Sequence, residues 1–226
     1  MTISSLPVGS GPCSCVLTQR DVKLIVVTGG PGAGKTAVLE MARRSLCKHI
    51  AILPEAAGIV FGGGFPRLES TAGRCASQRA IFHVQRELEA LALGSGKDIA
   101  VALCDRGTID GAAYWPEEAG SYWQALATSL AAELDRYAAV IHLRTPAAGQ
   151  GFNQSNPLRR ETAEQAAVLD ARIAEAWGRH ARRTEIPNHS DFLEKARRVL
   201  ECVRAELPTC YRGHDLDLPR PPGQAL

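Results

Sequence analysis

The 226-residue sequence predicts an α/β fold, a doubly wound parallel sheet placed between two layers of helices. Short apolar runs alternate along the chain with longer segments of helical periodicity. Several of these runs are apolar at successive positions rather than at every second position. A continuous apolar run indicates a strand buried on both faces, as in a parallel sheet with helices on both sides. The length suits one domain of this kind.

Five runs are predicted to be the strands of the sheet. In chain order they are Lys23–Thr28, His49–Leu53, Asp98–Cys104, Ala138–Leu143 and Thr184–Pro187. The first, third and fourth are the continuous apolar runs, and the last is the weakest. Parallel strands joined through helices imply right-handed crossovers, but the spacing of the runs says nothing about strand order.

The segments between the predicted strands have the periodicity of helices. They are Lys35–Cys47, Gln78–Leu93, Tyr122–Tyr137, Glu161–Arg182 and Asp191–Leu207. In the second of these helices, Ile81, Val84, Leu88 and Leu91 fall on one stripe, which we predict faces the core.

Both ends of the chain lack such patterns. Residues 1–20 are rich in Ser, Gly, Pro and Cys, which predicts a flexible leader. Residues 208–226 are dense in proline and are predicted to form an irregular tail. The folded domain is therefore expected over residues 21–207.

Composition and charge exclude several classes of protein. The formal net charge of +2 is too small to favour a nucleic-acid partner. No stretch reaches the ~18 apolar residues that a membrane-spanning helix needs, and the N-terminus does not have the pattern of a signal peptide. The seven cysteines include no CxxC pair, so reduced thiols are expected. We expect a soluble cytoplasmic protein.

The strongest motif is a glycine-rich segment, Gly29–Thr36, which reads GGPGAGKT and matches the phosphate-binding pattern GxxxxGK[ST]. A predicted strand runs into it and a predicted helix follows it. Glycines let the backbone approach phosphate oxygens closely, and the helix N-terminus adds positive charge. The residues predicted to bind the phosphates are Gly30, Gly32, Ala33, Gly34, Lys35 and Thr36. Lys35 would reach the β- and γ-phosphates, and Thr36 would ligate Mg²⁺.

Charged residues follow the second and third predicted strands, at the edge where open α/β sheets bind ligands. Glu55 is a candidate general base, or alternatively a carboxylate in the first turn of a helix. Asp105 is a candidate Mg²⁺ ligand, directly or through water, or alternatively a helix N-cap or a solvated turn residue. Arg106 would stabilise charge on a transferred phosphoryl group, or form a structural ion pair.

A long polar segment, near residues 145–160, follows the fourth predicted strand. It contains Gly and Pro and ends at Arg159 and Arg160. Such a segment is typical of a lid that closes over a nucleotide and supplies cations to it. The alternative is an ordinary loop followed by a charged helix start.

Four aromatic residues cluster after the third predicted strand: Tyr114, Trp115, Tyr122 and Trp123. They would stack on a planar substrate, or pack in the core, which is the more common use of such residues. His142 has no paired nucleophile in the sequence and is interpreted as structural.

Several segments together resemble a known family. They read VVTGGPGAGKT, LPEAAG, CDRGTIDGAAYW, IHLRTP, NPLRRETAEQA and TEIPN. Over residues 22–205 they resemble the P-loop "AAA domain" ATP-binding proteins, a group similar to nucleoside and nucleotide kinases rather than to ring-forming ATPases. The resemblance implies a P-loop NTPase fold with strand order 2-3-1-4-5, and ATP and Mg²⁺ as cofactors.

The resemblance also implies roles for single residues. Deoxynucleoside kinases carry a catalytic Glu after strand two, which Glu55 matches. They carry an acid–arginine pair after strand three, which Asp105 and Arg106 match, with Asp in place of the usual Glu and Gly107 where Ser is common. Their lid arginines would correspond to Arg159 or Arg160. A nicotinamide riboside kinase domain is another relative by the same pattern.

These observations predict an ATP-dependent phosphotransferase that acts on a small-molecule hydroxyl, nucleoside-like or from another metabolite. The predicted catalytic residues are Lys35, Glu55, Asp105, Arg106, Arg159 and Arg160. Its partners would be ATP and the acceptor, without nucleic acid or membrane, and a homodimer is compatible with kinases of this shape. The alternative is a regulatory ATPase whose hydrolysis is coupled to a partner protein.

Overall fold

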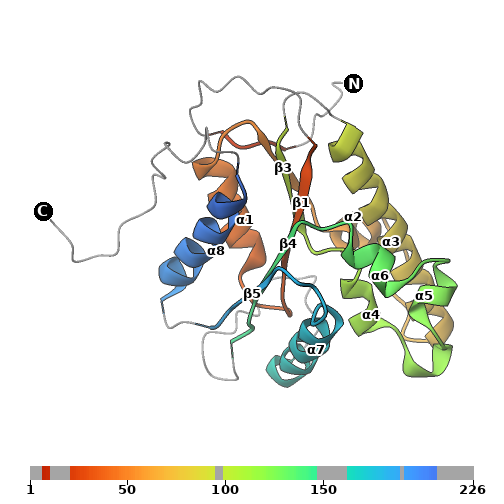
Figure 1. The fold of residues 1–226 in the computed structure, drawn as a ribbon. Coiled ribbons are helices and arrows are strands. Elements are labelled where there is room, and N and C mark those ends of the chain that lie inside the picture. Colours follow the sequence, from red (N-terminus) through yellow and green to blue (C-terminus); the bar gives the residue numbers. More distant parts are fainter. Residues whose placement is uncertain (1–6, 11–20, 95–98, 147–161, 189–190, 208–226) are drawn as a thin grey trace, which may run out of the picture.

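A computed structural model describes residues 7–10, 21–94, 99–146, 162–188 and 191–207. It contains one sheet, whose strands are β1 (Lys23–Thr28), β2 (Ile50–Leu53), β3 (Val101–Asp105), β4 (Ala139–Leu143) and β5 (Arg183–Ile186). The order across the sheet is β2-β3-β1-β4-β5, and every neighbouring pair is parallel (Figure 1). The predicted fold class and strand order are confirmed.

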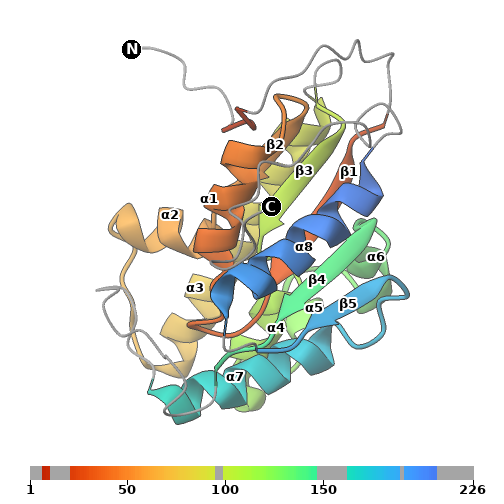
Figure 2. The ribbon, with the colours of Figure 1, turned by 90° about the vertical axis from the view of Figure 1, so that its left-hand side faces the viewer.

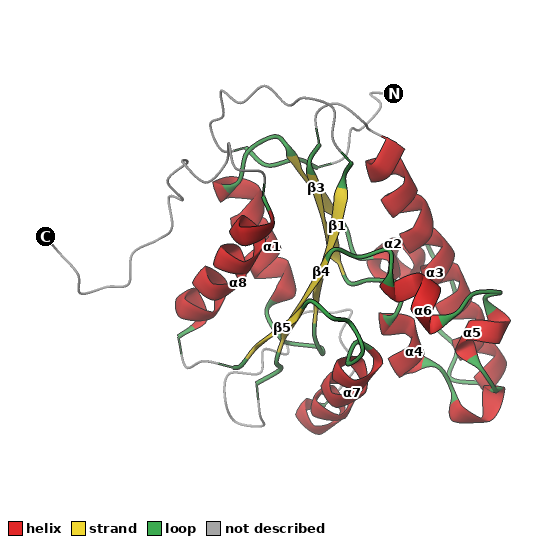
Figure 3. Cartoon of the chain, viewed as in Figure 1, coloured by secondary structure: helices red, strands yellow, loops and turns green. Residues whose placement is uncertain are grey.

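Helices cover both faces of the sheet. Helices α1 (Lys35–Ser45) and α8 (Phe192–Glu206) lie side by side on one face, and α3 (Thr71–Gly94) and α7 (Ala163–Ala176) lie on the other (Figures 1 and 2). The remaining helices are short. They are α2 (Ala56–Gly62), α4 (Asp110–Tyr114), the 3₁₀ turn η1 (Glu117–Ala119), α5 (Tyr122–Ala125) and α6 (Leu130–Leu134) (Figure 3).

The central strand β1 shows why the apolar runs are continuous. Ile25 and Val27 pack in the core beneath α1 and α8, whereas Leu24 and Val26 pack in the core on the opposite face. Side chains alternate between the two faces of a strand, so a strand covered on both sides needs an apolar residue at every position.

The helix predicted over Tyr122–Tyr137 is wrong, because the chain forms two short helices there. Between α5 and α6, Ala127 adopts a left-handed conformation with φ 52°. The Ser129 hydroxyl then accepts a hydrogen bond from the Ala132 amide and caps the start of α6. Side-chain capping competes with helix continuation at such positions, and helical periodicity does not reveal it.

The predicted buried stripe of the second helix is also wrong. Ile81, Val84 and Leu88 are only partly buried, and Leu91 is 61% exposed. The buried side chains of α3 are instead Cys75, Ser77, Phe82, Gln85, Glu89 and Ala92. This face of the helix includes polar residues that have hydrogen-bond partners inside the protein, which an apolar pattern cannot indicate.

A short piece of the N-terminal segment lies against the edge strand β2. Val8 forms an antiparallel bridge with Ala51. The amide of Gly9 donates to the Ile50 carbonyl at 2.9 Å, and the amide of Ile52 donates to the Pro7 carbonyl at 2.8 Å. These bonds satisfy an edge that would otherwise be open to pairing.

The rest of the predicted leader and the predicted tail, 208–226, lie outside the described residues. Among the helices that the structure describes, none combines the length and the apolar character required to cross a bilayer.

We expect Ala127→Gly to stabilise the protein, because glycine adopts the left-handed conformation without the steric penalty of a Cβ. The gain should be about 0.5 kcal/mol in the free energy of unfolding, since greater freedom of the unfolded chain offsets part of it. Urea denaturation measures this change. Ala131→Gly, inside α6, is the matched control and should have the opposite sign; destabilisation by both would contradict the explanation.

Candidate functional site

The glycine-rich segment forms a tight loop between β1 and α1. Gly29, Gly32 and Gly34 have φ values of 137°, 81° and 94°, a region that side-chain-bearing residues rarely adopt. α1 begins at Lys35, so its first amides face the loop. The loop therefore has the local geometry of an anion site at a helix N-terminus.

Lys35 points back into this loop. Its Nζ donates to the carbonyl oxygens of Gly29 at 2.8 Å and Gly30 at 3.1 Å. Burial, together with the charge of Arg106, lowers the pKa of Lys35 to about 8. The neighbouring Thr36 is exposed.

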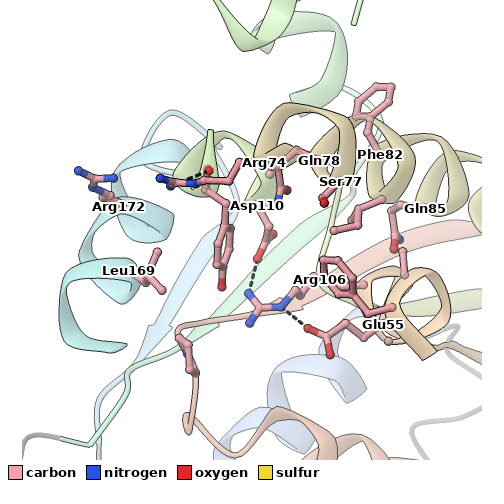
Figure 4. A pocket seen from close by; sticks show the side chains of 18 of the residues that line it. Glu55, Arg74, Ser77, Gln78, Phe82, Gln85, Arg106, Asp110, Leu169 and Arg172 are labelled. Carbon is pink, nitrogen blue, oxygen red and sulfur yellow. Dashed lines mark hydrogen bonds and ion pairs between the residues drawn. The ribbon is translucent and has the colours of Figure 1, made fainter. Parts of the chain in front are cut away.

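A pocket of about 770 Å³ lies beside the loop at the carboxyl ends of the central strands (Figure 4). The phosphate loop forms one wall, and the other walls come from α2, α3, α7 and the segment that follows β3. All four charged residues predicted near the phosphates in the described chain line it: Lys35, Glu55, Asp105 and Arg106.

Arg106 connects the parts of the site. Its Nε donates to Glu55 Oε1 at 2.7 Å, and its Nη1 donates to Asp110 Oδ1 at 3.0 Å (Figure 4). Nη1 also donates to the Gly29 carbonyl at 3.2 Å. Its guanidinium also lies 5.8 Å from the centre of the Tyr114 ring. The backbone has φ 72°, a conformation that costs a non-glycine residue about 1 kcal/mol or more.

Glu55 directly precedes α2, and its carboxylate is directed at Arg106 (Figure 4). Burial raises the pKa of Glu55, but the charges of Arg106 and Lys35 outweigh this effect and lower it overall. Its side chain is 39% exposed and faces the pocket. Glu55 is thus ionised at neutral pH and held in one orientation by its ion pair.

Asp105 ends β3 and is buried. Its Oδ1 is buried without a hydrogen-bond partner in the described part of the chain. Burial raises the pKa of Asp105 to about 6; the charge of Lys35 opposes this rise and that of Glu55 adds to it. A buried carboxylate oxygen without a partner fits a site for a divalent cation.

Within the described ranges, no group of three or more His, Cys, Asp or Glu side chains is placed to hold a metal ion. A cation at Asp105 and Thr36 would therefore need further oxygen ligands. Mg²⁺ is commonly bound in this way, through one or two protein oxygens together with substrate phosphates and water.

Asp110 is a site residue that the sequence reasoning missed. It is 3% exposed and accepts hydrogen bonds from Thr28 Oγ1, Arg106 Nη1, the Gly107 amide and Trp177 Nε1. Two of these donors come from residues far away in the sequence. The available signal was weak: an acid one helical turn after an arginine, in a segment without periodicity.

A second buried polar group lies behind the pocket. The Gln85 side chain lines the pocket, and its Nε2 donates to Glu89 Oε1 at 2.8 Å. Glu89 is fully buried, accepts a hydrogen bond from the Tyr137 hydroxyl at 2.8 Å and pairs with Arg136. Because its amide nitrogen is bonded to Glu89, Gln85 has its carbonyl oxygen left to accept a bond from a ligand.

The four predicted aromatic residues divide between two roles. Trp115 and Tyr122 are buried in a small core with Phe82, and Trp123 packs against it. Tyr114 lines the pocket beside Arg106. Core packing therefore involves three of the four, of which Tyr122 also lines the pocket.

The predicted lid falls mostly outside the described residues, including Arg159 and Arg160. Three other arginines that the sequence reasoning did not select line the pocket: Arg67, Arg74 and Arg172. Arg74 donates to the Tyr114 carbonyl at 3.3 Å, and Arg172 pairs with Glu117 at 2.9 Å.

The parallel sheet, the strand order and the glycine-rich loop together define a P-loop nucleotide-binding fold. A family model described as "AAA domain" matches residues 24–195, so the chain belongs to this family. This confirms the family expected from the sequence.

Solved structures with the same fold include NadR protein. A crystal structure of NadR protein in complex with NR has a TM-score of 0.65 and 13% identity, and the match covers 87% of this chain and 53% of that one. NadR protein in complex with NAD and AMP-PNP has a TM-score of 0.55 and 12% identity, with 87% and 51% covered. This chain spans about half the length of either. A comparison with curated proteins found no match.

We expect Gly107→Ser to destabilise the protein, although Ser is common there in the kinases that the sequence resembles. A Cβ at Gly107 would lie 2.8 Å from Trp177 Cζ2 and 3.0 Å from Val26 Cγ2. The Trp177 ring is fully buried and cannot move aside, so the cost should be about 1–3 kcal/mol of unfolding free energy. Chemical denaturation measures it. Gly62→Ser is the control, because its Cβ would meet no atom within 4 Å; equal effects would argue against the clash.

The affinity for Mg·ATP should depend on pH in two steps. Below about pH 6 Asp105 takes up a proton and loses its affinity for a cation, and above about pH 8 Lys35 loses the charge that attracts phosphate. Binding should therefore be strongest between these values, as measured by calorimetry from about pH 5 to 9. Asp105→Asn should remove the acidic step; its persistence would exclude Asp105 as the group responsible.

Proposed function

We propose that the protein is an ATP-dependent phosphotransferase that transfers the γ-phosphoryl group to a hydroxyl of a small molecule. The observation that carries this proposal is the position of Glu55. Its carboxylate is ionised, is held by Arg106 at 2.7 Å, and lines the same pocket as the phosphate loop, whose volume of about 770 Å³ can hold a second substrate beside the nucleotide phosphates.

In the proposed reaction, catalysis comes mainly from positioning the substrates and from stabilising charge, as is usual for phosphoryl transfer. The loop amides and Lys35 would bind the phosphates, and Thr36 and Asp105 would hold Mg²⁺. The cation, when bound, neutralises charge on the phosphate oxygens. Glu55 would orient the acceptor hydroxyl and accept its proton, while Arg106 keeps Glu55 in place.

The acceptor side of the pocket favours a planar, polar molecule. Gln85 (Figure 4) offers a hydrogen-bond acceptor. Phe82 and Tyr114, which also line the pocket, offer aromatic surface. A nucleoside-like acceptor fits this chemistry. The complex of NadR protein with NR also supports nicotinamide riboside as one compound to test.

Two parts of the sequence-based hypothesis remain proposals. Arg159 and Arg160 would supply positive charge to the transferred phosphoryl group, and one of them should matter more than the other. The regulatory ATPase is the alternative reading of the same phosphate loop, and the experiments below separate it from the kinase.

We expect Glu55→Gln to lower kcat on the true acceptor by about 10²-fold, because the variant keeps the size of the side chain but loses the proton acceptor. The affinity for Mg·ATP should change little, since Glu55 would face the acceptor and not the nucleotide. Steady-state kinetics measure both quantities. Glu69→Gln, which replaces another carboxylate of the pocket lining, is the control. An unchanged kcat in Glu55→Gln would remove Glu55 from the mechanism.

The deciding experiment measures ADP release from Mg·ATP with and without a panel of nucleosides, nicotinamide riboside and other hydroxylated metabolites. Lys35→Ala serves as the blank. Stimulation by one compound, with a phosphorylated product detected by mass, would establish the phosphotransferase. Slow hydrolysis that is indifferent to every compound would contradict it and favour the regulatory ATPase.

A further inference from the structure

One peptide group of the phosphate loop, between Gly29 and Gly30, is held from both sides. Its N–H donates to Asp170 Oδ1 at 2.8 Å. Its C=O accepts bonds from Lys35 Nζ at 2.8 Å and from Arg106 Nη1 at 3.2 Å. A trans peptide is planar, and its N–H and C=O point in opposite directions. Asp170 and Lys35 therefore bind opposite ends of one rigid unit.

The Asp170 carboxylate is buried and is fixed in position by two side chains besides the Gly30 amide. Asp170 lies on α7 and is 2% exposed. Its Oδ1 is 2.9 Å from His142 Nε2, and its Oδ2 is 3.1 Å from Arg144 Nε. Burial raises the pKa of Asp170, but the hydrogen bonds from His142 and Gly30 outweigh this and lower it. The carboxylate is thus ionised, and its bond to the Gly30 amide is charge-assisted.

The packing around Gly30 leaves little freedom to the loop. A Cβ on Gly30 would lie 2.5 Å from Thr145 Oγ1 and 2.7 Å from Asp170 Cβ. The loop therefore touches both α7 and the residue that follows Arg144. This contact makes the orientation of the Gly29–Gly30 peptide sensitive to the side chain at position 170.

The residue type at this position argues for more than packing. The neighbouring buried residues of α7 on the same face are Ala166, Ile173 and, just after the helix, Trp177. An acid in this apolar stripe has to be desolvated, a cost that an apolar residue of similar size would avoid. The partners that offset this cost are His142, Arg144 and the Gly30 amide, and the last of these belongs to the phosphate loop.

We propose that Asp170 is a positioning residue that acts on Lys35 through the Gly29–Gly30 peptide. A carboxylate bound to the N–H polarises the peptide and makes its C=O a better acceptor. The carbonyl then holds the Lys35 ammonium within the loop, where it exchanges carbonyl oxygens for phosphate oxygens when a nucleotide arrives. This inference rests on the nucleotide-binding role of the loop in the proposed function.

The test is a double-mutant cycle on the affinity for Mg·ATP, measured by calorimetry. Asp170→Asn keeps the size and one oxygen of the side chain but removes its charge. It should raise the Kd about tenfold, and in the Lys35→Ala background it should change the Kd less than about twofold, because the effect passes through Lys35. Glu175→Gln, an exposed acid on the same helix, is the matched control and should leave the Kd unchanged.

A second measurement reports on Lys35 without any nucleotide. Removing the charge of Asp170 weakens the carbonyl acceptor, so the ammonium protons of Lys35 should exchange with water faster in Asp170→Asn. NMR of the lysine side chain measures this exchange, and thermal unfolding shows whether both variants fold.

The outcomes separate this inference from the proposed function. Equal losses of affinity in both backgrounds, an unchanged Kd, or unchanged proton exchange of the Lys35 ammonium would overturn the positioning role of Asp170. If the wild-type chain binds no Mg·ATP, the proposed function fails, and the proton exchange of Lys35 still decides whether Asp170 acts on it.

Discussion

The burial of the Arg106 guanidinium is the constraint on which the rest of the site depends. Its side chain is 14% exposed, and an uncompensated charge at such a position would cost several kcal/mol. Glu55 and Asp110 supply the opposite charges, and the Gly29 carbonyl accepts a further bond. The guanidinium thereby joins the end of β2, the segment after β3 and the phosphate loop into one arrangement.

Two charged groups of the pocket, Lys35 and Asp105, have shifted pKa values that a bound nucleotide and a bound cation would reverse. Lys35 has a lowered pKa because it is buried near Arg106, and Asp105 has a raised pKa because its carboxylate is buried with an oxygen that lacks a partner in the described chain. Phosphate oxygens would favour the charged form of Lys35, and a divalent cation would favour that of Asp105. The proposed ligands would therefore stabilise the charged forms of both Lys35 and Asp105.

Much of the fold could be predicted from the sequence because its signals are local. Burial on both faces leaves a continuous apolar run such as Lys23–Thr28, and the loop needs glycine at three positions with positive φ. The helix over Tyr122–Tyr137 was wrong because one residue in a left-handed conformation interrupts it. The stripe of α3 was wrong because Gln85 and Glu89 are buried in hydrogen bonds with each other and with distant residues.

The sequence by itself determined the α/β fold, the family and the phosphate loop, since each depends on residues that are neighbours in the chain. Only the tertiary structure decided which charges meet. Asp170 and Gly30 are 140 positions apart, and Thr28 and Asp110 are 82 apart, yet both pairs are hydrogen-bonded. The identity of an acid does not encode its partner, because crossovers between parallel strands bring distant segments to the same edge of the sheet.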